Sequence, residues 1–267
     1  MAEINPQILR FDSLPSTNLE AAKRAAEGAA EGLCVVAAEQ TAGRGRLQRQ
    51  WVSPRGAGLY FSIVLRPQFP QSAWPLLSLM AAVAVHDALI DSCKLKTDIK
   101  WPNDILVNEK KLCGILAETV ETPKGRAVVV GIGVNLTKDS FPTEFQEVAT
   151  SVEIAVGHKP DLEKLLAALI SSLASYYQQM QQPGGGEEIV REWCLHSSYS
   201  HGKRVRVNDG EKHFVGMTRG VGSDGALSVE TDDGEIRVLR AGEVQSVRPA
   251  TTPQHVAASN LESDDQR

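Results

Sequence analysis

The chain has 267 residues, of which 42% are apolar and 23% are charged, and a formal net charge of −5. This composition is typical of a globular protein with one sizeable core and room for a small second domain. The negative charge gives no overall attraction for nucleic acid, so any phosphate binding must come from local clusters. The four cysteines occur singly along the chain, which indicates neither a disulfide framework nor a zinc site.

The sequence shows no sign of export or of a membrane anchor. Its beginning, MAEINPQILRF, lacks the basic start and the apolar run of about 7 to 15 residues that a secretory signal needs. The most apolar stretch, residues 76–90, contains His86 and Asp87 and is shorter than the roughly 20 residues that span a bilayer. We therefore expect a cytoplasmic protein.

The first half of the chain predicts a mixture of helices and strands. Thr17 and Glu20 have capping-box spacing and predict a helix that runs to Gly28. Two runs rich in β-branched and aromatic residues, 33–38 and 58–65, predict strands on either side of a polar loop. A core helix and a group of closely spaced strands should follow, at 72–89 for the helix and at 99–101, 104–107, 111–118 and 127–136 for the strands.

The second half changes character near residue 196. Residues 161–180 predict an amphipathic helix and residues 187–195 a shorter one. Beyond residue 196, short strand-like runs alternate with Gly and Asp turns, which predicts a small β-barrel. The expected organisation is a domain at 1–195, a second at 196–250 and a disordered tail at 251–267.

The first segment with chemical character is GRGRLQRQW, residues 43–51. It gathers Arg44, Arg46 and Arg49 beside Gly43 and Gly45, whose backbone freedom lets the loop fold around an anion. The guanidinium group pairs bidentately with carboxylate or phosphate. A solvated basic surface loop is the alternative that this segment alone leaves open.

The second segment is KWPNDILVNEKK, residues 100–111, which reads as a strand end followed by a hairpin. It brings Lys100, Asn103, Asp104 and Lys111 within reach of one site. Asp104 could hold Mg2+ together with nucleotide phosphates, because magnesium prefers one or two carboxylates plus phosphate oxygens. Taken alone, Pro-Asn-Asp is equally a turn.

Several motifs in a fixed order carry a resemblance. They are Ser16-Thr17-Asn18, Gln40 followed by GRGR, KWPND, Lys111-Leu-Cys-Gly114 and Gly131-Ile-Gly-Val-Asn135. Over residues 8–248 this order resembles the biotin protein ligase family. The resemblance implies an α+β fold, in which a mixed sheet packed by helices forms a class II synthetase-like catalytic domain, followed by an SH3-like β-barrel. It also implies ATP-dependent formation of biotinyl-5'-AMP and transfer of biotin to a carrier lysine.

The resemblance further implies roles for individual residues. Lys111 and Arg46 would be catalytic, and Asp104 would hold Mg2+. The implied biotin-binding residues are Ser16, Thr17, Asn18, Gln40, Arg44, Gly45, Arg46, Lys111, Gly114 and Gly133. The implied ATP-binding residues are Arg46, Arg49, Lys100, Asn103, Asp104, Lys111, Asn135 and Arg248.

Partners follow from the same resemblance. The acceptor would be the biotin carboxyl carrier protein of acetyl-CoA carboxylase, and two copies of the chain could pair through edge strands. Only about seven residues precede the first matching element, so we expect no winged-helix domain and no sequence-specific DNA binding. Leu47-Gln48 stands where the family commonly has Arg-Gly, which predicts faster leakage of the adenylate.

Two other functions compete with this interpretation. A lipoate or octanoate ligase or transferase would share the fold, with Cys113 as an acyl-transfer nucleophile, although Cys113 is more simply a strand residue. Alternatively, the C-terminal barrel could bind RNA or a protein. Nucleic-acid-binding barrels use aromatic residues that stack on the bases. Residues 208–248 contain a single Phe, Tyr or Trp, namely Phe214, which disfavours RNA binding.

Overall fold

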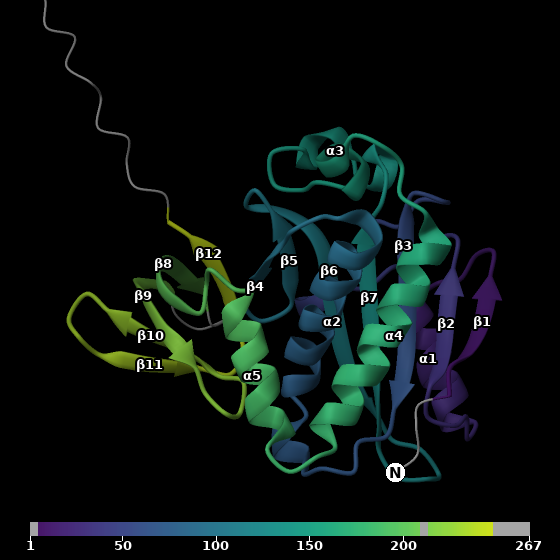
Figure 1. Cartoon of the computed structure of the whole chain (residues 1–267), viewed down its shortest axis with the longest axis horizontal. Helices are drawn as coiled ribbons and strands as arrows, with labels where there is room; N and C mark the ends of the chain where they lie inside the picture. Colours follow the sequence, from purple (N-terminus) through teal and green to yellow (C-terminus); the bar gives the residue numbers. More distant parts are fainter. Residues whose placement is uncertain (1–4, 209–212, 248–267) are drawn as a thin grey trace, which may run out of the picture.

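A seven-stranded sheet forms the centre of the protein (Figure 1). The computed structural model describes residues 5–208 and 213–247. The strands are β1 (Gln7–Phe11), β2 (Leu33–Ala37), β3 (Gly58–Leu65), β4 (Asp98–Lys100), β5 (Asp104–Val107), β6 (Lys110–Val120) and β7 (Ala127–Asn135). Their order is β1-β2-β3-β7-β6-β5-β4. Only β1 and β2 pair in parallel, so the sheet is mixed, as predicted.

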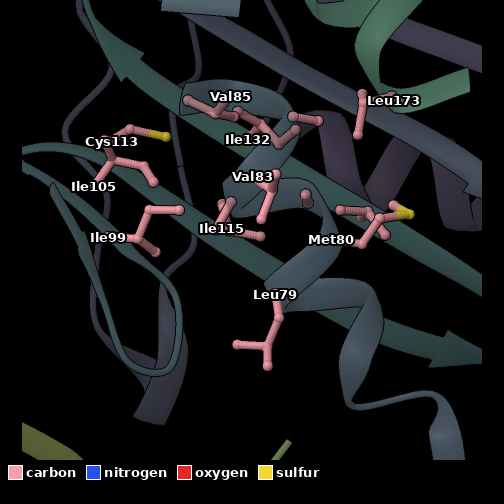
Figure 2. Packing of buried hydrophobic residues seen from close by; sticks show 14 of the residues in the cluster. Leu79, Met80, Val83, Val85, Ile99, Ile105, Cys113, Ile115, Ile132 and Leu173 are labelled. Atoms are coloured by element: carbon pink, nitrogen blue, oxygen red, sulfur yellow. The ribbon is translucent and has the colours of Figure 1, made fainter. Parts of the chain in front are cut away.

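Three helices cover one face of this sheet: α2 (Leu76–Cys93), α4 (Leu162–Met180) and α5 (Gly185–Leu195). Helix α2 packs against the sheet and also against α4 and α5, which explains why it is apolar on all sides. Figure 2 shows its side chain Val83 close to Ile115 of β6 and Ile132 of β7. By length and composition α2 could cross a membrane, yet 67% of it is buried inside the protein.

Helix α1 (Thr17–Ala26) covers part of the opposite face. Ala21 and Ala25 pack against Val35, Val64 and Val129. The helix itself was predicted, but its predicted cap is wrong. Ser16 is the N-cap residue but its side chain makes no capping hydrogen bond, Thr17 lies inside the helix, and the Thr17 backbone N–H is instead bound by the side chain of Gln40.

The loops between these elements agree with local sequence signals. The β5–β6 hairpin turns at Asn108 and Glu109, both with positive φ, as a two-residue turn requires. Asp161 caps α4 by accepting hydrogen bonds from two backbone N–H groups. The remaining short elements are α3 (Val152–Val156) and the 3-10 turns Arg46–Gln48, Gln71–Ala73, Lys138–Ser140 and Thr143–Phe145.

A separate antiparallel sheet forms the C-terminal part, in the order β11-β10-β9-β8-β12. Its strands are β8 (His201–Asn208), β9 (His213–Val221), β10 (Leu227–Thr231), β11 (Ile236–Leu239) and β12 (Glu243–Ser246). The buried Trp101 donates a hydrogen bond of 2.9 Å from Nε1 to the Gly225 carbonyl and so joins the two parts. A domain limit at residue 195 stays a prediction, and Arg248 and the tail lie outside the described residues.

Candidate active site

A cavity of about 410 Å³ lies where the N-terminus of α1, the basic loop at 43–51 and strands β6 and β7 meet. Arg248 lies outside the described residues, and every described residue that was assigned to the site from the sequence lines this cavity. These are Ser16, Thr17, Asn18, Gln40, Arg44, Gly45, Arg46, Arg49, Lys100, Asn103, Asp104, Lys111, Gly114, Gly133 and Asn135. The structure therefore brings together motifs that are more than 100 residues apart in the chain.

Two paired glycines form part of the cavity wall. Gly114 of β6 lies opposite Gly133 of β7, and the indole of Trp51 covers both. A Cβ atom at Gly133 would lie 2.6 Å from Trp51 Nε1, and one at Gly114 would lie 3.1 Å from the indole carbon Cζ3. The glycines make room for Trp51, whose buried Nε1 has no hydrogen-bond partner within the described residues.

One end of the cavity is polar and uncharged. The Thr17 backbone N–H donates to Gln40 Oε1 at 2.8 Å, and Gln40 Nε2 donates to Ser53 Oγ at 2.8 Å. Ser62 Oγ lies 2.8 Å from Thr17 Oγ1. Ser16 is 2% exposed, and its hydroxyl makes no hydrogen bond to any part of the chain that the structure describes. This end can therefore offer neutral donors and acceptors to a ligand.

Asn18 is fixed by several contacts at the same end. Its Nδ2 donates to Glu118 Oε2 at 2.9 Å and to the Leu116 carbonyl at 3.2 Å, while its Oδ1 accepts from Ser62 at 2.6 Å. Gly131 is required beside it, because a Cβ there would lie 2.0 Å from Asn18 Oδ1. Both amide donors of Asn18 are thus used inside the protein.

The other end of the cavity is charged. Asp104 Oδ1 lies 2.7 Å from Lys111 Nζ, and Asp104 Oδ2 lies 3.1 Å from Lys100 Nζ. Burial raises the pKa of Asp104, but the two lysines outweigh it and hold the pKa below its ordinary value. Lys111 Nζ also lies 5.4 Å from the centre of the Trp51 ring. Two ammonium groups are therefore held by one ionised carboxylate.

Asp104 does not fit the predicted role of magnesium ligand. Each of its carboxylate oxygens lies within ion-pair distance of an ammonium group, although Oδ1 makes no well-oriented hydrogen bond with any described residue. The other acidic side chain lining the cavity, Glu243, is paired with Arg49. Among the described residues, each carboxylate that lines this cavity thus has a cationic neighbour.

Three arginines attach the basic loop to different parts of the site. Arg44 donates to Glu118 at 2.7 Å, and Arg46 donates to Asn103 Oδ1 at 3.2 Å. Arg49 pairs with Glu243 on β12 of the C-terminal sheet. Burial lowers the pKa of Arg46, although its guanidinium stays charged at neutral pH. These contacts attach the loop to the cavity wall, although the side chains of Arg44 and Arg49 stay exposed to solvent.

The departure at Leu47 and Gln48 has a structural consequence. Both residues have positive φ, 53° and 61° respectively. This left-handed conformation suits glycine and costs other residues about 1 kcal/mol or more. The resemblance leads us to expect glycine at position 48, so with Gln48 the loop adopts a conformation that its own residue disfavours.

Three cavity or network residues were not found from the sequence. Glu118 and Glu243 each hold an arginine of the basic loop, and Trp51 covers the paired glycines. Alternation along β6 places Glu118 on the same side as Gly114, so this residue had a detectable signal. Trp51 ends the GRGRLQRQW segment and so also had a signal, whereas Glu243 depends on a contact across the fold and had none.

Cys113 is unsuited to act as a nucleophile. Its side chain is fully buried in the main hydrophobic core, and burial raises the pKa of its thiol. An acyl-transfer cysteine needs a thiolate and access to substrate. Cys113 therefore belongs to the packing of β6.

Comparisons with known proteins agree with this geometry. Residues 9–135 match the model of the "Biotin/lipoate A/B protein ligase family", and residues 200–246 match the "Biotin protein ligase C terminal domain". The biotin--[acetyl-CoA-carboxylase] ligase of Paracoccus denitrificans is 38% identical over 237 residues, covering 86% of this chain and 96% of that protein. The bifunctional ligase/repressor BirA of Bacillus subtilis is 37% identical over 241 residues, covering 88% of this chain and 72% of the relative.

A solved structure extends the match to three dimensions. The biotin protein ligase of Aquifex aeolicus in complex with biotin and ATP superposes with a TM-score of 0.79 and 27% identity, covering 91% of this chain and 99% of that one. The similarity thus includes both the seven-stranded sheet and the C-terminal part. The chain belongs to the biotin protein ligase family.

Proposed function

We propose that the protein makes biotinyl-5'-AMP from biotin and ATP in this cavity and then transfers the biotinyl group to a lysine of a biotin carboxyl carrier protein. The observation that carries the proposal is that one cavity holds a neutral polar end and a cationic end, with Trp51 contacting both. Biotin has the matching polarity, because a neutral ureido ring and a carboxylate stand at opposite ends of an apolar chain. Ser16 and Gln40 would bind the ureido ring, and Lys111 the carboxylate.

The apolar part of biotin would lie along Trp51. Its indole provides a broad apolar surface between the two ends. A pocket of mostly apolar walls with a few placed polar groups is the usual form of a small-molecule site. Gly114 and Gly133 would act by seating Trp51.

The first reaction joins two anions. A biotin carboxylate oxygen attacks the α-phosphorus of ATP, the bond to the β-phosphate oxygen breaks, and pyrophosphate leaves. Lys111 and Lys100 would reduce the repulsion and stabilise the charge that develops on the α-phosphate oxygens. Asp104 would hold both ammonium groups in place. Arg49, Asn103 and Asn135 would complete the nucleotide side.

The second reaction moves the biotinyl group. The neutral amine of the carrier lysine attacks the carbonyl carbon of the mixed anhydride, the bond to the phosphate oxygen breaks, and AMP leaves while the amine loses a proton. Until then the anhydride must be kept from water. Arg44, Gly45 and Arg46 of the basic loop would close over it.

The cellular setting is part of the proposal. The names of the relatives support acetyl-CoA carboxylase as the source of the carrier. We place the reaction in the cytoplasm. We also expect no repressor activity, because a net charge of −5 gives no overall attraction for DNA. A gel-shift assay tests the latter, since tight salt-resistant binding to an operator would contradict it. Pairing of two copies through an edge strand stays an expectation that light scattering can test.

A comparison of two acids tests the proposed activity. The protein is incubated with ATP and Mg2+ and with either biotin or lipoate, and pyrophosphate release is measured. We expect release with biotin and not with lipoate. Release with lipoate alone would favour the lipoate ligase, and no release with either would favour a binding module.

A further inference from the structure

Glu118 on β6 links two parts of the cavity that the proposed reaction uses separately. One carboxylate oxygen, Oε1, accepts from Arg44 of the basic loop at 2.7 Å. The other, Oε2, accepts from Asn18 Nδ2 at the start of α1 at 2.9 Å. A single side chain thus touches the loop that would cover the adenylate and the polar end that would bind the ureido ring.

Only a carboxylate satisfies both partners at once. Arg44 and Asn18 Nδ2 are donors, so the residue between them must present two acceptors. Glutamine has the same shape but only one acceptor oxygen, and its amide nitrogen would face another donor. Replacing Glu118 by glutamine therefore keeps the packing and breaks one of the two contacts.

The Asn18 contact also determines how that amide is turned. Glu118 and the Leu116 carbonyl take both hydrogens of Asn18 Nδ2, and Ser62 donates to Asn18 Oδ1. A carbonyl oxygen has two lone pairs, so Oδ1 keeps one acceptor site for a ligand N–H. Without Glu118, the amide loses the strongest of the contacts that hold this orientation.

The contact with Arg44 contributes little to the stability of the fold. The side chains of Arg44 and Glu118 are 43% and 30% exposed. Ion pairs this exposed typically contribute between 0 and about 1 kcal/mol. The main effect of the Arg44–Glu118 pair is to fix the position of the basic loop.

We propose that Glu118 is a positioning residue that couples closure of the basic loop to the polar end of the biotin pocket. This inference rests on the proposed function, because it assigns the two ends of the cavity to biotin and its adenylate. Coupling of this kind is reciprocal. A nucleotide that orders the loop tightens biotin binding, and biotin that orders Asn18 favours the closed loop.

The test compares Glu118→Gln with Glu121→Gln. Glu121 follows β6, pairs with Arg126 and is 73% exposed, so it is a matched Glu–Arg pair away from the cavity. Biotin affinity is measured by calorimetry with and without a non-hydrolysable ATP analogue, together with the KM values for biotin and ATP. Thermal unfolding checks that each variant is folded.

We expect Glu118→Gln to weaken biotin binding about tenfold, the equivalent of about 1.4 kcal/mol, and to raise KM for biotin more than KM for ATP. The analogue should tighten biotin binding in the wild type and in Glu121→Gln but not in Glu118→Gln. The inference would be overturned if Glu118→Gln and Glu121→Gln had the same biotin affinity and the same response to the analogue. It would also be overturned if Glu118→Gln raised KM for biotin and KM for ATP equally and lowered Tm. If the wild type neither binds biotin nor releases pyrophosphate, the proposed function fails instead.

Discussion

Lys111 Nζ lies 2.7 Å from the carboxylate of Asp104, a residue of the neighbouring strand β5. The pair places the ammonium group above Gly114 and beside the Trp51 ring. In this position Lys111 can contact both a biotin carboxylate and an α-phosphate. A lysine so placed supplies charge without having to reorganise during the reaction.

Replacing this lysine tests its role. Lys111→Ala should lower adenylate formation by at least about a hundredfold, a typical effect of removing one preorganised group. The fold should survive, because Lys100 still pairs with Asp104. Lys110→Ala is the control, since Lys110 binds the Gln146 carbonyl and does not line the cavity. A Lys111→Ala variant with more than a tenth of wild-type activity would remove Lys111 from this role.

Replacing Gly133 by alanine should impair biotin binding more than replacing Gly114. In Gly133→Ala the new methyl group would lie 2.6 Å from Trp51 Nε1, so the indole must move. We expect KM for biotin to rise about tenfold and stability to fall by about 1–3 kcal/mol. Gly114→Ala should do less, because its nearest contact is 3.1 Å. Biotin KM values in the opposite order would show that Trp51 does not form the pocket wall.

A glycine at a left-handed position of the basic loop should improve retention of the adenylate. Gln48→Gly should favour the ordered loop by up to about 1 kcal/mol and slow adenylate release up to about fivefold. Gln50→Gly adds flexibility where φ is not positive, so it should not slow release. Adenylate off-rates measured by stopped flow decide this. Release from Gln48→Gly at or above the wild-type rate would contradict the account.

Parts of the fold were predictable because their signal is local. Strands β2, β3, β6 and β7 and helix α4 follow from runs and periods of apolar residues. Strand β1 was missed because it is short and largely exposed, so its five residues show no clear alternation. The Thr17 cap was wrong because that hydroxyl bonds to Ser62 and Gln40, which are distant in sequence.

The site was predictable to a similar extent. Motif residues such as Lys111 could be carried over one by one and were found around one cavity. The contacts that hold them, Arg44 with Glu118 and Arg49 with Glu243, join positions far apart in the chain. No sequence spacing encodes such pairs, so they required the structure.

Acid should destabilise the fold through His86, which is 2% exposed and donates to or accepts from Thr97 Oγ1. Burial, and then the nearby His196, lowers the pKa of His86 from 6.5 to about 4. Between these values the unfolded chain binds a proton that the folded protein does not, so stability falls as the pH falls from 6.5 to 4. The loss from this group is about 3 kcal/mol.

Urea unfolding at pH 7 and pH 4.5 measures this dependence. His86→Gln should be less sensitive to pH than the wild type, whereas His158→Gln, at an exposed position, should match the wild type. The same pH dependence in His86→Gln and the wild type would show that His86 does not titrate in this way.

The most direct test of the account is mass spectrometry of a biotin carboxyl carrier domain incubated with the protein, ATP, Mg2+ and biotin. We predict one biotinyl group on a single lysine with the wild type and none with Lys111→Ala. An unmodified carrier with the wild type, or equal modification by the Lys111→Ala variant, would contradict the proposal that biotin is activated in this cavity.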